Sequence, residues 1–195
     1  MNAATTESLP APTAAASFSA IEDASVLVVD DSRTMRLVLT RELHKLGFTR
    51  ISEAADGRKA IERIRREPFD LVLLDMEMPE LDGMGVLLEI RNDPELRGLP
   101  VIVISGAEQV DSAVKCIEAG AEDYLPKPFN ATLLRARVTT SLEKKRLRDL
   151  DRVRLKQLQA EKDQFQFTLV HNAKARPSIP GRAFRTNTCA LVAAI

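Results

Sequence analysis

Five polar residues of this chain could form one site, because each of them follows a short apolar run. They are Asp30 and Asp31 after the first run, Asp75 after the second, Ser105 after the third and Lys127 shortly after the fourth. Carboxylates gathered in one place repel each other unless a cation or a proton joins them. These residue types therefore predict a polar crevice in which a cation or a proton balances the acids, beside a hydroxyl and an ammonium group.

The apolar runs indicate the strands that position these residues. Val26–Val29, Leu71–Leu74 and Val101–Ile104 are typical of strands buried on both faces of a parallel sheet. Open α/β sheets bind their ligands at the carboxyl ends of such strands. Each polar residue alone has a local interpretation, such as a helix cap at Asp31 or an Asx turn at Asp75. All five at the ends of four strands are harder to attribute to turns.

Strand-like and helix-like patterns alternate five times between Ser25 and about Ser141. This alternation predicts five βα units with right-handed crossovers, in an α/β fold with a central parallel sheet and helices on both faces. Gly47 and Ala119-Gly120 are expected to end two of the helices, and Asn130 to cap the last. The other expected strands are Phe48–Ala54 and Tyr124-Leu125, the latter ended by Pro126-Lys127-Pro128, and the expected helices are Thr34–Leu46, Arg58–Arg66, Gly85–Arg91, Val110–Glu118 and a fifth from near Asn130.

No helix breaker occurs between Asn130 and about His171, which predicts an unusually long helix. Within it, Glu143–Lys162 carries eight basic and four acidic residues among spaced apolar residues, without a strict heptad. A coiled coil and a partly formed, solvated helix both stay open. We therefore expect a disordered leader at 1–24, one domain at 25–141, a long helix or coiled coil at 142–170, and a disordered or truncated tail at 171–195.

Composition bounds the function only loosely. The 28 basic and 28 acidic residues balance, so charge gives no support to a role on membranes or on specific nucleic-acid sequences. The longest apolar runs are far shorter than the ~20 residues that a membrane helix needs. The leader has no Lys or Arg and no apolar core, which argues against a signal peptide. Cys116 and Cys189 lack metal or redox spacing, and we expect a cytoplasmic protein.

Four motifs in order resemble the receiver domain of two-component response regulators. The resemblance covers roughly Ser25 to Ser141, about three-fifths of the chain. It implies a flavodoxin-like, five-stranded, doubly wound parallel sheet in the order 2-1-3-4-5, here with an extended C-terminal helix. The motifs are Val-Val-Asp30-Asp31-Ser, Leu-Leu-Asp75-Met-Glu-Met-Pro79-Glu-Leu-Asp-Gly83, Ile-Ser105-Gly-Ala and Asp-Tyr124-Leu-Pro-Lys127-Pro128-Phe129.

The resemblance implies that Asp75 accepts a phosphoryl group from a sensor histidine kinase or a small phosphodonor. Asp31 and Asp75, with the backbone carbonyl of Glu77, match the Mg²⁺ ligands of the family. Asp30 matches the carboxylate that holds the ion mainly through water. The chemistry agrees with the residue types, because Mg²⁺ prefers oxygen ligands and neutralises both reactants of phosphoryl transfer.

The remaining matches imply charge balance and a switch. Lys127 supplies a point charge for one phosphoryl oxygen and Ser105 a hydroxyl for another. Ser105 and Tyr124 match the switch pair of the family, and the Lys127-Pro128 bond matches a position that is often cis. Phosphorylation would change the surface formed by the fourth helix, the fifth strand and the fifth helix. The chain would then be a self-modifying signalling module rather than an enzyme.

The continuous run from Gly120 to Arg148 resembles a subset of receivers that lead through a helical linker into a nucleotide cyclase or a serine/threonine phosphatase domain. No such output domain is present in these 195 residues. Either the chain is a fragment, or the long helix is itself the output. We expect a homodimer through the fifth helix or the long helix, and a downstream effector or missing output domain as the partner.

Three other classes of protein fit less well. A Mg²⁺-dependent α/β phosphohydrolase with an Asp nucleophile is the main alternative. Such enzymes usually place two acids two residues apart on the first strand, whereas Asp30 and Asp31 are adjacent. A nucleotide-binding enzyme would need a Gly-rich loop there instead of Asp-Asp-Ser-Arg. A DNA-binding regulator would need a helix-turn-helix, and none follows the basic stretch.

Overall fold

The computed structural model describes the backbone of residues 23–106 and 110–174, and the side chains of residues 23–106 and 114–168. Most of the expected leader and tail therefore lies outside the described residues. Two compact units are distinguished, which divide after Asp151. All the described strands belong to the first unit, and the described part of the second is a stretch of helix. The boundary expected near residue 142 stays a prediction.

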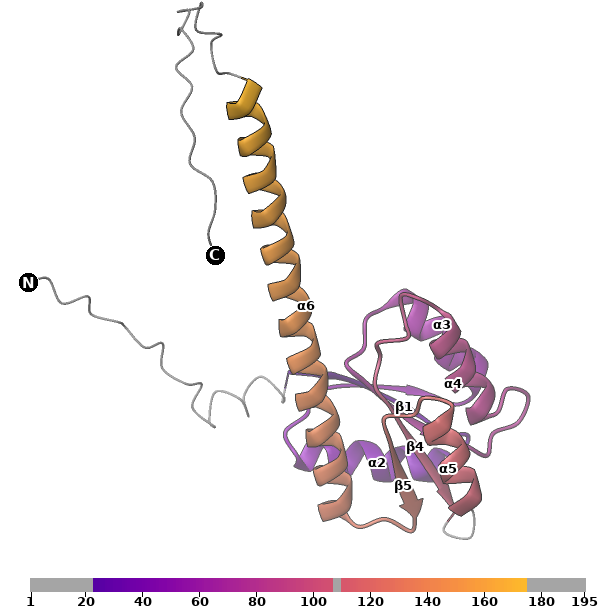
Figure 1. Cartoon of the computed structure of the whole chain (residues 1–195). Helices are drawn as coiled ribbons and strands as arrows, with labels where there is room; N and C mark the ends of the chain where they lie inside the picture. Colours follow the sequence, from indigo (N-terminus) through magenta and orange to yellow (C-terminus); the bar gives the residue numbers. More distant parts are fainter. Residues whose placement is uncertain (1–22, 107–109, 175–195) are drawn as a thin grey trace, which may run out of the picture. The chain divides into compact units, whose positions relative to one another are not determined.

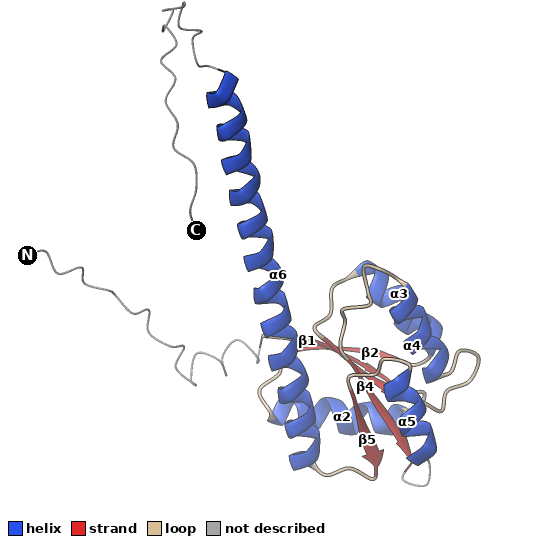
Figure 2. Ribbon diagram, in the orientation of Figure 1, coloured by secondary structure: helices blue, strands red, loops and turns tan. Residues whose placement is uncertain are grey.

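A five-stranded parallel sheet (Figure 2) forms the centre of the first unit. Its strand order is β2-β1-β3-β4-β5. This confirms the predicted flavodoxin-like arrangement. The three central strands are buried along almost their whole length, as expected of apolar runs covered on both faces, while the two edge strands are more exposed. The strands are β1 Ser25–Val29, β2 Arg50–Ala54, β3 Leu71–Asp75, β4 Val101–Gly106 and β5 Asp123–Lys127.

Alternate residues of the central strands face opposite layers of helices. Leu27 and Val29 of β1 pack in one core with α3, α4 and α5, whereas Val26 and Val28 pack in a second core with α2 and α6. In Figure 1, α3, α4 and α5 lie together on one side of the sheet. The helices are α2 Arg33–Lys45, α3 Gly57–Arg66, α4 Gly83–Asn92, α5 Val110–Glu118 and α6 Ala131–Lys174.

Side-chain caps determine where the helices begin, and hence the course of the loops at the carboxyl ends of the strands. Each cap accepts a hydrogen bond from the backbone N–H three residues further on. Gly47 and Gly120, with φ of 96° and 100°, follow α2 and α5 and confirm the predicted helix stops. The caps are Ser32 for α2, Asp56 for α3, Asp82 for α4 and the predicted Asn130 for α6.

β5 differs most from its prediction. The strand was expected to end before Pro126, but it continues to Lys127, and Pro126 pairs with Ser105 of β4. Proline is tolerated because β5 is an edge strand, whose outer side makes no ladder hydrogen bonds. Lys127 is therefore held as the last residue of a strand. A smaller correction is that β2 begins only at Arg50. Gly85–Arg91 forms most of α4, as expected, and this helix begins at Gly83, directly after its cap.

The long C-terminal helix is confirmed, since α6 spans 44 residues. In the first unit it buries Leu134, Val138 and Leu142 against the sheet. In the second unit, the described side chains from residue 152 to residue 168 are exposed. None of the helices in the described residues combines the length and the apolar character needed to cross a membrane.

Candidate functional site

Parallel pairing brings the predicted acids together at the carboxyl end of the sheet. Val29 pairs with Leu74 across β1 and β3, so Asp30 and Asp75 are the next residues on neighbouring strands. Asp31 follows in the loop that leads into α2. Oxygen atoms of all three carboxylates lie within 4.8 Å of one another. The cluster that the sequence predicted is therefore present.

Lys127 bridges the two buried acids. Its Nζ donates to Asp30 Oδ2 at 3.1 Å and lies 2.9 Å from Asp75 Oδ1. The other oxygen of Asp30 accepts a hydrogen bond from the backbone N–H of Ser32 at 2.8 Å. Asp30 and Asp75 are almost completely buried, so each carboxylate relies on these partners for its solvation.

Burial raises the pKa of Asp75 above its ordinary value, and the Asp30 carboxylate raises it further, although hydrogen bonds from Lys127 and the Glu77 backbone lower it. Burial lowers the pKa of Lys127, but hydrogen bonds to Asp75 and Asp30 outweigh this effect and raise it. Lys127 is therefore charged at neutral pH. One ammonium among three carboxylates leaves the site able to accept a further cation.

The donor set and its spacing fit Mg²⁺. Mg²⁺ binds oxygen ligands in an octahedron with Mg–O distances of about 2.1 Å, so its ligand oxygens lie about 3 to 4 Å apart. The carboxylate oxygens of this cluster lie within 4.8 Å of one another, which is close to that separation. Asp31 is exposed, and its carboxylate has no protein partner among the described residues. Asp31 and Asp75 could thus bind the ion directly, while the binding of Asp30 through water stays a prediction. The role of the Glu77 carbonyl stays a prediction.

The proposed switch residues lie on β4 and β5. Ser105 is buried and follows Ile104, the residue that pairs with Asp75. Tyr124 is half-buried on the edge strand, and its hydroxyl donates to the backbone carbonyl of Gly106 at 3.2 Å. The Lys127-Pro128 bond is cis. Both side chains are thus placed on the strands that flank the site, while their coupling stays a prediction.

Close backbone contacts hold the loop after Asp75. A Cβ atom on Gly83 would overlap the carbonyl oxygen of Asp75 and the backbone of Met76. A Cβ atom on Gly57 would overlap the carbonyl oxygen of Leu81 in the same loop. Glycine at these two positions lets α3 and α4 begin directly against the loop that carries the acceptor residue.

Sequence reasoning missed the group that holds the acidic loop. Arg36 Nη1 donates to the carbonyl oxygens of Asp30 and Asp31 at 2.8 and 3.2 Å, and its Nε donates to Glu53 of β2. In the sequence, Arg36 is an ordinary polar residue of an amphipathic helix. Nothing in its spacing indicates that its side chain turns back toward the loop.

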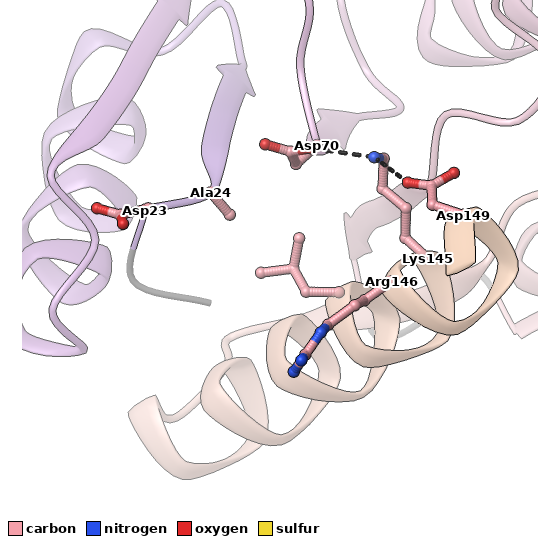
Figure 3. Close-up of a pocket in the computed structure, with 7 residues that line it drawn as sticks. Asp23, Ala24, Asp70, Lys145, Arg146 and Asp149 are labelled. Carbon is pink, nitrogen blue, oxygen red and sulfur yellow. Dashed lines mark hydrogen bonds and ion pairs between the residues drawn. The ribbon is translucent and has the colours of Figure 1, made fainter. Parts of the chain in front are cut away.

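A separate cavity of about 170 Å³ lies at the opposite, amino-terminal end of the sheet. Figure 3 shows Lys145 of α6 there between Asp70 and Asp149, at 3.0 and 2.8 Å. Asp70 also accepts a hydrogen bond from the backbone N–H of Ser25. The cavity therefore marks a junction between α6 and the sheet, remote from the carboxylate cluster.

Comparisons with known proteins agree with this geometry. The profile of the response regulator receiver domain matches residues 26–139. Chemotaxis protein CheY-3 of Vibrio cholerae is 35% identical over 119 residues, which are 61% of this chain and 92% of that protein. The receiver domain of NtrX from Brucella abortus has a TM-score of 0.58 and 34% identity, over 61% of this chain and 98% of that one. A two-component system response regulator/GGDEF domain protein has a TM-score of 0.63 and 32% identity, over 67% of this chain and 54% of that one.

The matched region includes the whole sheet and the carboxylate cluster with its lysine. These matches do not favour the phosphohydrolase alternative. The chain belongs to the response regulator receiver domain family.

Proposed function

We propose that Asp75 is the phosphoacceptor of this two-component response regulator and that its phosphorylation depends on Mg²⁺. The observation that carries the proposal is the meeting of three carboxylates and one ammonium group at the carboxyl end of the sheet. Lys127 is bonded there to both Asp30 and Asp75. Membership in the receiver family supports the same assignment.

The proposed reaction transfers a phosphoryl group to a carboxylate oxygen of Asp75. A bond forms between that oxygen and phosphorus, and the bond from phosphorus to a histidine nitrogen of a sensor kinase, or to the oxygen of a small phosphodonor, breaks. Asp31, Asp75 and the Glu77 carbonyl would hold Mg²⁺, with Asp30 acting through water, and the ion would supply charge neutralisation when bound. The chain modifies itself and acts on no external substrate in this scheme.

Lys127 and Ser105 would complete the phosphoryl pocket. Lys127 would exchange its contact with the Asp75 carboxylate for a contact with a phosphoryl oxygen. Its ammonium group would then have an anionic partner before and after phosphorylation. The buried Ser105 hydroxyl lies on the neighbouring strand, where a shift toward the site would allow it to donate to a second oxygen. Ser105 and Tyr124 then form the proposed switch pair.

The surface of α5, β5 and α6 is the proposed output. Tyr124 and Lys127 share β5, so a change at the end of this strand can reach the tyrosine. Asp123, the first residue of β5, lies 2.9 Å from Arg137 of α6, and Glu122, just before the strand, lies 2.9 Å from Arg148. β5 is therefore connected to α6 by ion pairs, and a population shift at the site could change the surface of that helix.

Exposed apolar residues on α6 support a role in passing the signal on. Leu147 and Leu150 are exposed in the first unit, as are Val153, Leu155 and Leu158 in the second. Apolar side chains gathered on an exposed helix often mark contact with another chain. We propose that this helix mediates a homodimer, or leads into a cyclase or phosphatase output domain of a longer protein.

Incubation of the full chain with acetyl phosphate and Mg²⁺ tests the phosphoacceptor assignment. Mass spectrometry should show one added phosphoryl group, which chelation of Mg²⁺ prevents. Asp75→Asn should abolish the addition, whereas Asp151→Asn, which removes an exposed carboxylate from α6, should leave it unchanged. An unmodified wild-type chain, or a modification that persists in Asp75→Asn, would refute the proposal.

A further inference from the structure

Arg36 controls the backbone on both sides of Asp31. Its Nη1 donates to the Asp30 carbonyl at 2.8 Å and to the Asp31 carbonyl at 3.2 Å. Each carbonyl belongs to a planar peptide unit, and these two units flank the Cα atom of Asp31. Hydrogen bonds to both carbonyl oxygens restrain the orientation of these two units, and therefore the φ and ψ of Asp31 and the direction of its Cβ. A single guanidinium group thus aims the Asp31 side chain.

This backbone control matters because Asp31 lacks other constraints. Asp30 and Asp75 are buried and bonded to Lys127, so their carboxylates are held by side-chain contacts. Asp31 is exposed, and its carboxylate has no protein partner among the described residues. Its position relative to the other two acids therefore depends on the loop that carries it.

Glu53 and Thr40 hold the guanidinium group in turn. Glu53 Oε2 accepts from Arg36 Nε at 3.1 Å, and Glu53 Oε1 accepts from the Thr40 hydroxyl at 3.1 Å. Both oxygens of Glu53 are thus used, one toward each of two side chains of α2, while Glu53 itself belongs to β2. The Arg36 side chain is only 13% exposed, so these bonds are partly shielded from water. The planar fork of arginine suits such simultaneous contacts, and lysine cannot reproduce them.

We propose that Arg36 is a positioning residue for metal binding, oriented by Glu53 and Thr40, which presents Asp31 to Mg²⁺. The inference rests on the proposed function, since it assigns Asp31 as a metal ligand. Residues that orient a ligand from outside the coordination shell commonly change metal affinity by about 10- to 100-fold when they are removed.

The test measures Mg²⁺ affinity in the full chain by calorimetric titration, without any phosphodonor. Arg36→Ala should weaken Mg²⁺ binding by about 10-fold or more. Arg36→Lys should recover it only in part. The matched control is Arg91→Ala, which removes the same charge and bonds to two backbone carbonyls, those of Gly120 at 2.8 Å and Leu99 at 2.9 Å, outside the Arg36–Glu53 network. This control should bind Mg²⁺ with nearly wild-type affinity.

Two further measurements separate positioning from general damage. The phosphorylation rate of Arg36→Ala with acetyl phosphate should approach the wild-type rate at saturating Mg²⁺, because the defect lies in ion binding. A cavity of about 440 Å³ lies beside Arg36 and Glu53. Guanidinium ion at a low, non-denaturing concentration should enter the space left by Arg36→Ala and raise its Mg²⁺ affinity, and no such rise would count against the proposal.

The outcomes distinguish this inference from the proposed function. A wild-type chain that neither binds Mg²⁺ nor becomes phosphorylated would refute the proposed function. A phosphorylated wild type, with Arg36→Ala binding Mg²⁺ as well as Arg91→Ala does, would refute the positioning role alone. If Arg36→Ala does not fold, Glu53→Gln decides: it keeps Arg36 but weakens its anchor, and an unchanged Mg²⁺ affinity in that variant would contradict the proposal.

Discussion

Asp75→Asn should stabilise the fold at neutral pH in the absence of divalent ions. The substitution keeps the size of the side chain and removes one of three clustered carboxylate charges. It also removes the attraction of that charge to Lys127, so the two effects oppose each other. The direction of the result depends on their relative sizes.

The distances in the site give those sizes. Two unit charges 4.8 Å apart interact by roughly 3 to 4 kcal/mol at an effective dielectric constant of about 20. This repulsion applies in full between Asp75 and buried Asp30, and in part with exposed Asp31. The Lys127 ammonium at 2.9 Å attracts Asp75 by roughly 6 kcal/mol at the same dielectric constant. Solvent screening of the partly exposed lysine reduces this attraction. Attraction and repulsion nearly balance, so the cost of burying the carboxylate decides the sign, and we expect a gain of about 1 kcal/mol.

The pH dependence follows from the raised pKa of Asp75, whose largest cause is burial. The folded state binds a proton more tightly than the unfolded state, for which the ordinary value is 3.8. The contribution of Asp75 to stability therefore falls as the pH rises from that value through the raised pKa of the folded state. Below pH 3.8, Asp75 is protonated in both the folded and the unfolded state, so its burial then costs little folding free energy. The advantage of Asp75→Asn should therefore be larger at pH 7 than at pH 4 and should shrink as the pH falls between them.

Thermal denaturation followed by circular dichroism checks this prediction, with Asp151→Asn as the control for loss of an exposed carboxylate. In chelator at pH 7, the melting temperature of Asp75→Asn should rise by about 2–8 °C. Saturating Mg²⁺ should reverse the order, because the wild type binds the ion more tightly and ligand binding stabilises the folded state. An Asp75→Asn variant less stable than the wild type in chelator at pH 7 would falsify the electrostatic reasoning.

Three further predictions concern the loop, the helix junction and assembly. Gly83→Ala should weaken Mg²⁺ binding and slow phosphorylation by acetyl phosphate, because its Cβ overlaps backbone, whereas Gly85→Ala meets mainly the flexible end of a side chain and should have a smaller effect. Lys145→Ala removes the contact to Asp70, so amide hydrogen exchange in the first unit's part of α6 should become faster; unchanged protection would show that apolar packing alone holds the helix. Truncation after Ser141 should abolish self-association in light scattering, and a full chain that is monomeric with and without beryllofluoride would argue against a dimer through α6.

Much of the fold could be predicted because the sheet depends on local patterns. β1, β3 and β4 are apolar on both faces, and only a parallel sheet covered by two helical layers buries such strands. The position of β5 was harder to predict, because its exposed residues and Pro126 weaken the strand pattern. Pairing with β4 overrides that weak local preference, and it places Lys127 at the end of the strand.

The sequence by itself determined which residues can do the chemistry. The acids, the hydroxyl and the lysine follow apolar runs, and parallel strands place their carboxyl ends at one edge of the sheet. Only the tertiary structure decided how these groups are held. The bond from Arg36 to the loop of Asp30 and Asp31, and its anchor on Glu53, join α2, β2 and the end of β1. Such contacts depend on the directions in which long side chains extend between separate elements. The spacing of residues along the chain does not predict those directions.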